Sequence, residues 1–341
     1  MPSLTILVHL QNRTYNVLVN NPTPQSPTPF AAPEKHGCLY RLTRFLGYFA
    51  VLYVMLVGFI AINETNLVYP TSKYPRGNWN PNFDFQEVTF ISKDGTKIVG
   101  WYLPFEGATE NALLCHGNAE NVSQSATHYG LKFQSALNAN VFIFDYRGYG
   151  KSEGEPFEQG VLEDAEAAMN WLCEKADCQS NDIILVGHSI GGGPAVYLAS
   201  KHGGKSLFLQ RTFSSLVEPA AGQYWFIPVS LIMRNRYPSE ERIKNCEVPI
   251  HQSHGNLDAL VPITSGRKLF DASPAKLKRF YENANSGHWD KLPRAYWHDV
   301  KDFLAQVNEL PEYKKAIPPT NPEVEESPPT EKAAAIIEPG K

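Results

Sequence analysis

A serine flanked by glycines at the end of an apolar run is the feature of this sequence best suited to chemistry. Residues 183–186 (IILV) predict a buried β-strand, which leads directly into GHSIG at 187–191, a match to G-x-S-x-G. In such a strand-to-helix turn the glycines leave room for a tight backbone, and the hydroxyl of Ser189 is exposed above the sheet. A phosphate-binding glycine loop is the alternative, but the Lys-Ser/Thr pair of a P-loop does not follow. We therefore predict that Ser189 is a nucleophile.

An aspartate and a histidine follow Ser189 in the order that such a nucleophile requires. A serine hydroxyl attacks well only when a base takes its proton, and in this arrangement the acid and then the histidine each follow a late strand. Asp258 lies in a loop after the apolar run 248–251, and His288 lies in a loop after the run 280–282. We predict that His288 is the base and that Asp258 orients it.

Other acids and histidines are weaker candidates for these two roles. Asp145 is the serious rival for the acid, but its tight loop with Arg147 suggests structural hydrogen bonding. His188 adjoins the nucleophile and is expected to point elsewhere from the turn. The other candidates lie in or before strands, on a helix, or too close to the histidine in the chain: His116, His251, His254, His298 and Asp290.

The loop after the apolar run 112–115 can complete the site. Acyl transfer to a serine develops an oxyanion, which two backbone N–H groups bind, one after the nucleophile and one from an earlier loop. We predict that Ile190 and Asn118 supply them, the latter from the sequence His116-Gly117-Asn118. A turn that caps the next helix would explain the same sequence, and the two interpretations are compatible. This chemistry needs no cofactor or metal, and none is expected.

Strand and helix patterns alternate between about 80 and 310, which predicts one α/β domain. Short apolar runs separated by helices of ten residues or more are typical of a mainly parallel sheet covered on both faces. The Asp94-Gly95 pair predicts a hairpin that adds an antiparallel edge, so we expect eight strands. The expected helices are 121–137, 156–174, 190–202, 265–272 and 291–308.

Residues 45–62 (FLGYFAVLYVMLVGFIAI) predict a transmembrane anchor. These eighteen residues contain no charge, which is enough to cross the hydrocarbon layer as a helix. A cleaved signal peptide is disfavoured because forty-four residues precede the segment and no A-x-A site follows it. Arg41 and Arg44 lie before the segment and Glu64 after it, so the positive-inside rule predicts a single-pass protein with its catalytic domain on the non-cytoplasmic side.

The two ends of the chain and the overall charge indicate which segments fold and which kinds of partner the protein can bind. Residues 1–44, with the proline-rich linker 20–33, and the Pro/Glu-rich tail 311–341 are predicted to be disordered because they cannot bury enough apolar surface. The net charge of −4 gives no basic field for nucleic acid. The expected partners are therefore the membrane, through 45–62, and a small-molecule or lipid acyl substrate.

Taken together, these motifs resemble the α/β-hydrolase superfamily over about residues 83–308. Within it they are similar to the membrane-anchored Bem46-like hydrolases, which implies a serine hydrolase of esters or thioesters without a cofactor and gives Ser189, Asp258 and His288 the triad roles. An animal group of this superfamily carries an N-terminal cysteine cluster for acylation, whereas this chain has a hydrophobic segment, so protein depalmitoylation is not implied. The matching motifs are HGN at 116–118, DYRGYGKSEG at 145–154, GHSIGG at 187–192, HGNLDALVP at 254–262 and GHWD at 287–290.

The segment between the runs at 206–209 and 248–251 bears on the substrate. It is too short for a full lid, so we expect an open site, and its apolar stretch 224–233 either lines an acyl pocket or packs on the sheet. A serine peptidase with the same triad and a catalytically inactive, membrane-tethered binding module are the alternative functions. The intact set of three groups argues against the second.

Overall fold

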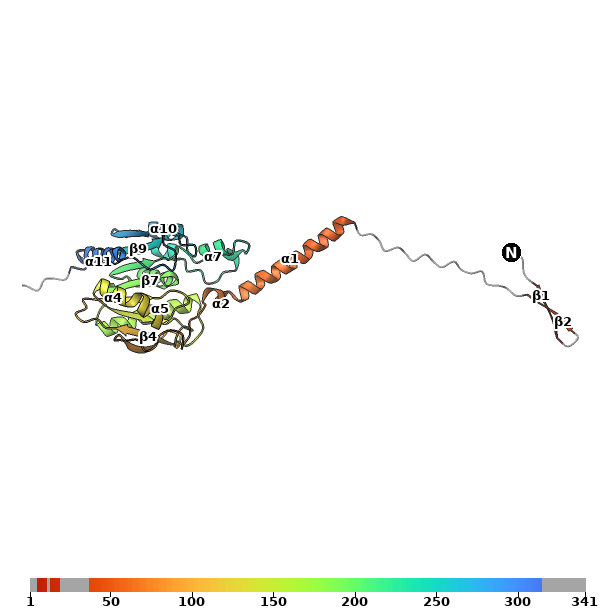
Figure 1. The fold of residues 1–341 in the computed structure, drawn as a ribbon, viewed down its shortest axis with the longest axis horizontal. Helices are drawn as coiled ribbons and strands as arrows, with labels where there is room; N and C mark the ends of the chain where they lie inside the picture. The colour runs from red at the N-terminus through yellow and green to blue at the C-terminus, as the bar shows by residue number, and fades with distance from the viewer. Residues whose placement is uncertain (1–4, 11–12, 19–36, 315–341) are drawn as a thin grey trace, which may run out of the picture. The chain divides into compact units, whose positions relative to one another are not determined.

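The computed structural model describes residues 5–10, 13–18 and 37–314, and the chain divides into the units Met1–Met55 and Leu56–Lys341 (Figure 1). The first unit contains an antiparallel hairpin of β1 (Thr5–Leu10) and β2 (Arg13–Leu18). The hairpin differs from the disorder predicted for 1–44, because pairing of these strands satisfies their backbone groups without a large core. Most of the predicted disordered tail lies outside the described residues.

Helix α1 (Cys38–Ile62) contains the predicted apolar segment and begins seven residues before it. Within the described part of the chain it is the one helix long and apolar enough to cross a membrane, and none of its residues is buried in the protein. The apolar helix is thus confirmed, while its place in a membrane stays a prediction. A short helix, α2 (Glu64–Val68), follows it directly.

The second unit is built on the predicted sheet, which has eight strands in the order β10-β9-β8-β7-β5-β6-β4-β3. The six strands from β10 to β6 in this order pair in parallel. Strand β4 pairs antiparallel with β6, and β3 and β4 form the antiparallel hairpin at one edge. The strands are β3 (Gln86–Ile91), β4 (Lys97–Leu103), β5 (Glu110–Cys115), β6 (Ala139–Phe144), β7 (Ile183–His188), β8 (Ser206–Gln210), β9 (Ile250–Gly255) and β10 (Lys278–Asn283).

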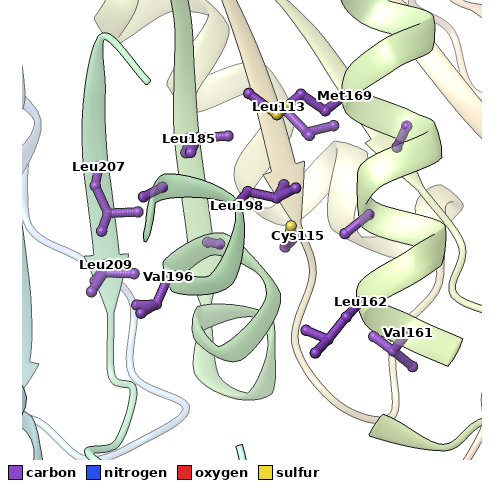
Figure 2. Close-up of a cluster of buried hydrophobic side chains, with 14 of the residues drawn as sticks. Leu113, Cys115, Val161, Leu162, Met169, Leu185, Val196, Leu198, Leu207 and Leu209 are labelled. Atoms are coloured by element: carbon purple, nitrogen blue, oxygen red, sulfur yellow. The ribbon is translucent and has the colours of Figure 1, made fainter. Parts of the chain in front are cut away.

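Helices cover both faces of this sheet because its central strands are apolar on both sides. In β7, Ile183 and Leu185 join one core cluster, while Ile184 and Val186 join the other, as the two-residue period of a strand requires. Figure 2 shows the first cluster, where the strand side chains meet those of two covering helices. The main helices are α3 (Val122–Ser125), η1 (Ala126–Gly130), α4 (Leu131–Leu137), α5 (Glu158–Ala176), α6 (Gly192–His202), α10 (Ile263–Ala272) and α11 (Arg294–Asn308).

Only short helices lie between β8 and β9, as the spacing predicts. They are α7 (Val217–Gln223), α8 (Val229–Ile232) and α9 (Ser239–Ile243), and we refer to residues 216–233, with α7 and α8, as the cap. A segment of this length cannot enclose a site completely. The carboxyl ends of the parallel strands, where open α/β sheets bind their ligands, therefore stay accessible beside the cap.

Candidate active site

Ser189 lies where β7 turns into helix, at the first residue of the 3₁₀ turn η3 (Ser189–Gly191). Its φ of 53° is left-handed, a conformation that costs energy for a residue with a side chain and that clusters at functional sites. The flanking glycines are required by space. A Cβ on Gly191 would lie 2.1 Å from the carbonyl oxygen of Cys115, and one on Gly187 would lie 2.7 Å from that of Gly191. The sequence therefore permits this strained turn by keeping both neighbours small.

The structure brings the three predicted residues of the triad together. His288 Nε2 lies 3.0 Å from Ser189 Oγ, and His288 Nδ1 lies 2.7 Å from Asp258 Oδ2. Asp258 follows β9 and His288 follows β10, so the register of neighbouring parallel strands sets their separation. All three residues are buried, with side chains in one continuous hydrogen-bonded row. This is the geometry in which a histidine can take a serine proton.

The surroundings of Asp258 favour its charged form. Burial opposes ionisation, but the hydrogen bond with His288, the N–H of Val261 at 2.8 Å and the nearby His254 together lower the pKa of this carboxyl. The N–H of Leu260 also donates to Oδ1, at 3.0 Å. A carboxylate held by two backbone N–H groups keeps a fixed orientation, so it can fix the tautomer of the histidine.

The residues predicted for the oxyanion hole border the same space as Ser189. Asn118, Ser189 and Ile190 line one cavity. Ile190 is at the start of a helical turn, where backbone N–H groups have no partner within the helix. The side chain of Asn118 is fixed, because its Nδ2 donates to the carbonyl oxygen of Val68 at 2.6 Å and its Oδ1 accepts from Tyr149 at 2.6 Å.

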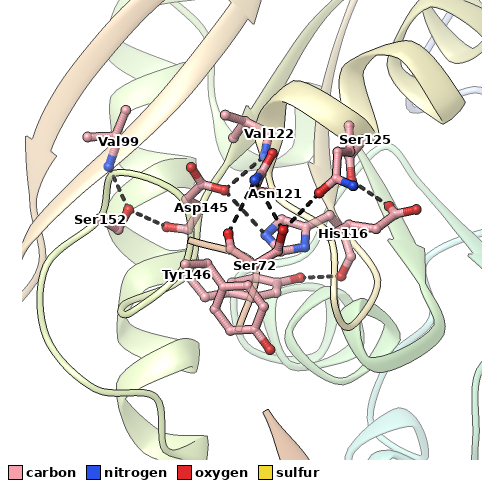
Figure 3. Close-up of polar contacts among 12 residues, drawn as sticks. Ser72, Val99, His116, Asn121, Val122, Ser125, Asp145, Tyr146 and Ser152 are labelled. Carbon is pink, nitrogen blue, oxygen red and sulfur yellow. Dashed lines mark hydrogen bonds and ion pairs between the residues drawn. The ribbon is translucent and has the colours of Figure 1, made fainter. Parts of the chain in front are cut away.

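The rival acid, Asp145, belongs to a different buried group, shown in Figure 3. Its Oδ1 accepts from the N–H of Val122 at 2.8 Å, and it lies 3.9 Å from His116 Nε2. Burial raises the pKa of Asp145 to about 7, against the hydrogen bond from Val122, and burial lowers the pKa of His116 to about 4. His116 also stacks on Tyr146 with ring centroids 4.2 Å apart. This pair supports the loop that carries Asn118 and does not face Ser189.

His188 is buried beside Ser189 in the chain, but its ring is turned away from it, as expected. Its ring packs on Tyr129 with centroids 4.3 Å apart, and burial lowers its pKa to about 3, so it is neutral at pH 7. Gly117 makes room for it, since a Cβ there would lie 2.5 Å from its Nδ1. Among the described residues, no cluster of three or more histidine, cysteine or acidic side chains has the arrangement of a metal site.

Arg211 contacts the loop of His288, and no pattern in the sequence indicates this contact. It is 2% exposed, and its Nη1 donates to the carbonyl oxygen of His288 at 2.6 Å while Nη2 donates to that of Asp290. Burial lowers its pKa, yet a guanidinium stays charged at any ordinary pH. Arg211 thus holds the backbone of the loop that carries the predicted base. No motif marks it, although its place directly after β8 is a general location for site residues.

Comparison with known proteins places this geometry in a family. Residues 113–229 match the model of the α/β-hydrolase fold family. An uncharacterised protein of Mycobacterium tuberculosis is 35% identical over 207 residues, which cover 60% of this chain and 73% of the relative. The chain belongs to the α/β-hydrolase family.

Relatives of this α/β-hydrolase in fungi match it over most of its length. The bem46 protein of Schizosaccharomyces pombe is 28% identical over 79% of this chain and 95% of its own, which confirms the resemblance to Bem46-like proteins. A protein of Saccharomyces cerevisiae named as a membrane protein is 28% identical over 77% of this chain and 96% of its own. Among solved structures, an esterase of Pyrococcus furiosus aligns with a TM-score of 0.57 at 20% identity, covering 69% of this chain and 98% of the esterase. At that identity the likeness shows the shared fold.

Proposed function

We propose that this α/β-hydrolase is a serine hydrolase that cleaves an acyl ester or thioester through an acyl-enzyme on Ser189. The observation that carries the proposal is the hydrogen-bonded row from Ser189 through His288 to Asp258, with spacings of 3.0 and 2.7 Å. A buried carboxylate and an imidazole that reach the hydroxyl of a serine on a strained turn are the groups that make such a serine a nucleophile.

In the acylation step, Ser189 Oγ forms a bond to the substrate carbonyl carbon while its proton passes to His288 Nε2. The resulting oxyanion would accept hydrogen bonds from the backbone N–H groups of Asn118 and Ile190. The bond between the carbonyl carbon and the leaving oxygen or sulfur then breaks, and the leaving group takes the proton from His288. A water molecule repeats the sequence on the acyl-serine, which releases the acid and restores Ser189.

An active-site-directed fluorophosphonate tests this function. The wild-type protein should be labelled, Ser189→Ala should not, and Ser200→Ala should be labelled like the wild type because Ser200 lies on α6, outside the site. A folded wild-type protein that stays unlabelled would refute the proposal and leave a non-catalytic binding module. Turnover of a p-nitrophenyl ester series alongside thioesters and aminoacyl substrates then separates esterase, thioesterase and peptidase.

We further propose that α1 anchors the enzyme in a membrane with the hydrolase domain on the non-cytoplasmic side. The apolar helix, the arginines Arg41 and Arg44 before it and the yeast relative named as a membrane protein support this arrangement. A reporter fused after Lys341 should give its signal on the non-cytoplasmic side. A cytoplasmic signal from a membrane-bound fusion would reverse the orientation.

A further inference from the structure

An apolar cavity of about 170 Å³ opens beside Ser189. One wall is the cap, through Leu216, Ala220 and Met233, and the floor includes the buried Phe213. None of the residues that line the cavity is charged. A surface that is apolar on several sides and ends at a nucleophile suits a hydrocarbon chain whose carbonyl carbon lies at Ser189.

The rim of this cavity is apolar as well. Leu67, Leu260 and Trp289 all line it and are 50%, 40% and 67% exposed. Leu67 belongs to α2, only five residues after the end of α1 at Ile62. Exposed apolar side chains around the opening of the cavity cost free energy in water. They therefore favour an arrangement in which the opening faces another apolar surface and not bulk solvent.

The cap is fixed to the last turns of α1. Val57 and Ile60 pack against a buried apolar cluster of the cap, which consists of Ile227, Val229 and Met233. The carboxylate of Glu64, at the start of α2, is buried and accepts from the backbone N–H groups of Arg234 and Asn235, each at 2.8 Å. The cap and the end of the helix therefore hold a defined position relative to each other.

The length of the apolar segment indicates that the contact between the cap and the end of α1 lies at the membrane surface. Residues 45–62 are eighteen in number and span about 27 Å as a helix, slightly less than the ~30 Å of a hydrocarbon core. Because the segment is no longer than the hydrocarbon core, all of it is needed to cross the bilayer. Val57 and Ile60, near its end, therefore lie within or at the edge of the bilayer in this arrangement. The cap residues packed against them lie at the same depth.

Two exposed apolar side chains of the cap agree with this depth. Trp225 and Leu231 are 82% and 83% exposed, the highest values among the large apolar residues of the unit that begins at Leu56. Tryptophan is enriched where protein meets the interface of a membrane, because its ring is apolar and its N–H is polar.

We propose that the cap rests in the surface of the bilayer that α1 crosses, and that the cavity takes the acyl chain of a lipid ester from that surface. This inference rests on the proposed hydrolase function and specifies its substrate class. The lipid's acyl chain enters between Leu216 and Phe213, its carbonyl carbon bonds to Ser189 Oγ, and its alcohol leaves with the proton from His288. The remainder of the lipid stays in the membrane.

Quenching of Trp225 by lipid tests the depth of the cap without any activity. The full-length protein is reconstituted in phosphatidylcholine vesicles with and without brominated acyl chains, and the wild type is compared with Trp225→Phe. The fluorescence lost to bromine should be smaller in Trp225→Phe by the share that Trp225 contributes. Trp79→Phe, which removes a ring that packs on Trp101, is the matched control and should keep the Trp225 share.

Two outcomes of this measurement would overturn the membrane contact. Equal bromine quenching in wild type and Trp225→Phe, with Trp225 open to aqueous iodide, would show that the cap faces water. Equal bromine quenching with Trp225 shielded from iodide would show that another protein surface, such as a second copy of this chain, covers the cap.

Alkyl fluorophosphonates test the cavity itself. In this reaction Ser189 Oγ bonds to phosphorus, the P–F bond breaks and the serine proton passes to His288. The rate constant should rise about fourfold per methylene from the ethyl reagent until the cavity is filled. Ala220→Phe should lower the ratio of dodecyl to ethyl rates at least about tenfold. Equal rates for both reagents in the wild type would refute the acyl pocket, whereas failure of both reagents to label would refute the hydrolase function instead.

Discussion

Replacing Arg211 by methionine should displace His288, the proposed base, while leaving the protein folded. The substitution keeps a long apolar stem but removes the donors to the carbonyl oxygens of His288 and Asp290. Each buried carbonyl left without a donor costs about 1–3 kcal/mol, and removal of a buried cation with no carboxylate partner offsets part of this cost. For the two carbonyls together the cost is about 2–6 kcal/mol, and because of this offset we expect the free energy of unfolding to fall by about 2 kcal/mol, the lower end of that range.

The effect on turnover should be larger than the effect on stability. A displacement of a catalytic group by about 1 Å costs on the order of 100-fold in rate. We therefore expect kcat for a soluble ester to fall about 100-fold in Arg211→Met with little change in KM, and about 10-fold in Arg211→Lys, which keeps the charge and can reach one carbonyl. Thermal unfolding is followed on the same samples.

A matched variant separates positioning from a general loss of arginine. Arg242 lies on α9, away from the loop of His288, and forms an ion pair with Glu158. Arg242→Met removes this ion pair and should keep a kcat near that of the wild type. A kcat of Arg211→Met within twofold of the wild type, whatever its stability, would refute the positioning role.

Three further perturbations follow from the site and its supports. Asp258→Asn should keep the fold and lower kcat by about 10⁴-fold because the histidine takes the wrong tautomer; full activity in steady-state assays would contradict the role of this acid. Burial opposes the charge of Glu120, but hydrogen bonds with His128 and Ser125 outweigh it and lower its pKa to about 2 from 4.5. The stabilisation from ionised Glu120 is thus present above pH 4.5 and lost as the pH falls to 2. In urea unfolding, the free energy of unfolding of Glu120→Gln should therefore fall by up to about 3 kcal/mol less than that of the wild type over this pH range. Glu64→Ala should lower the free energy of unfolding by about 2–4 kcal/mol, since several donors lose a buried carboxylate; a change below 0.5 kcal/mol, on the scale of ordinary surface sites, would contradict the joint between α2 and the cap.

Much of the fold could be predicted because its signals are local. The apolar runs of the parallel strands, the glycines around Ser189 and the Asp94-Gly95 turn each constrain their own backbone, whatever surrounds them. The order of serine, acid and histidine along the chain led to the prediction of Asp258 and His288, because the fold fixes which strand ends meet. The structure brings those three side chains into contact at hydrogen-bonding distance.

Other parts of the site depend on packing between distant segments. Arg211 contacts a loop about 77 residues further along the chain, and nothing in its neighbouring sequence indicates that partner. In the sequence Glu64 is visible only as a charge after the apolar segment, whereas in the structure it accepts hydrogen bonds from residues 170 and 171 positions away. Such contacts require the cap and the sheet to be assembled first. The hairpin at 5–18 was also missed, since its alternation is weak.

The order of the strands has a consequence for how copies of this protein behave when they are crowded together. β3 and β10 are the two edges of the sheet, and each has unpaired backbone groups that could accept a strand from a neighbour. β10 carries Lys278, Arg279 and Glu282, and β3 carries Glu87, charges that make a flat strand-to-strand junction unfavourable. Pairing on β10 would also pull on the strand that leads to His288. The same charges therefore guard against aggregation and against an inactive form in which two sheets have merged.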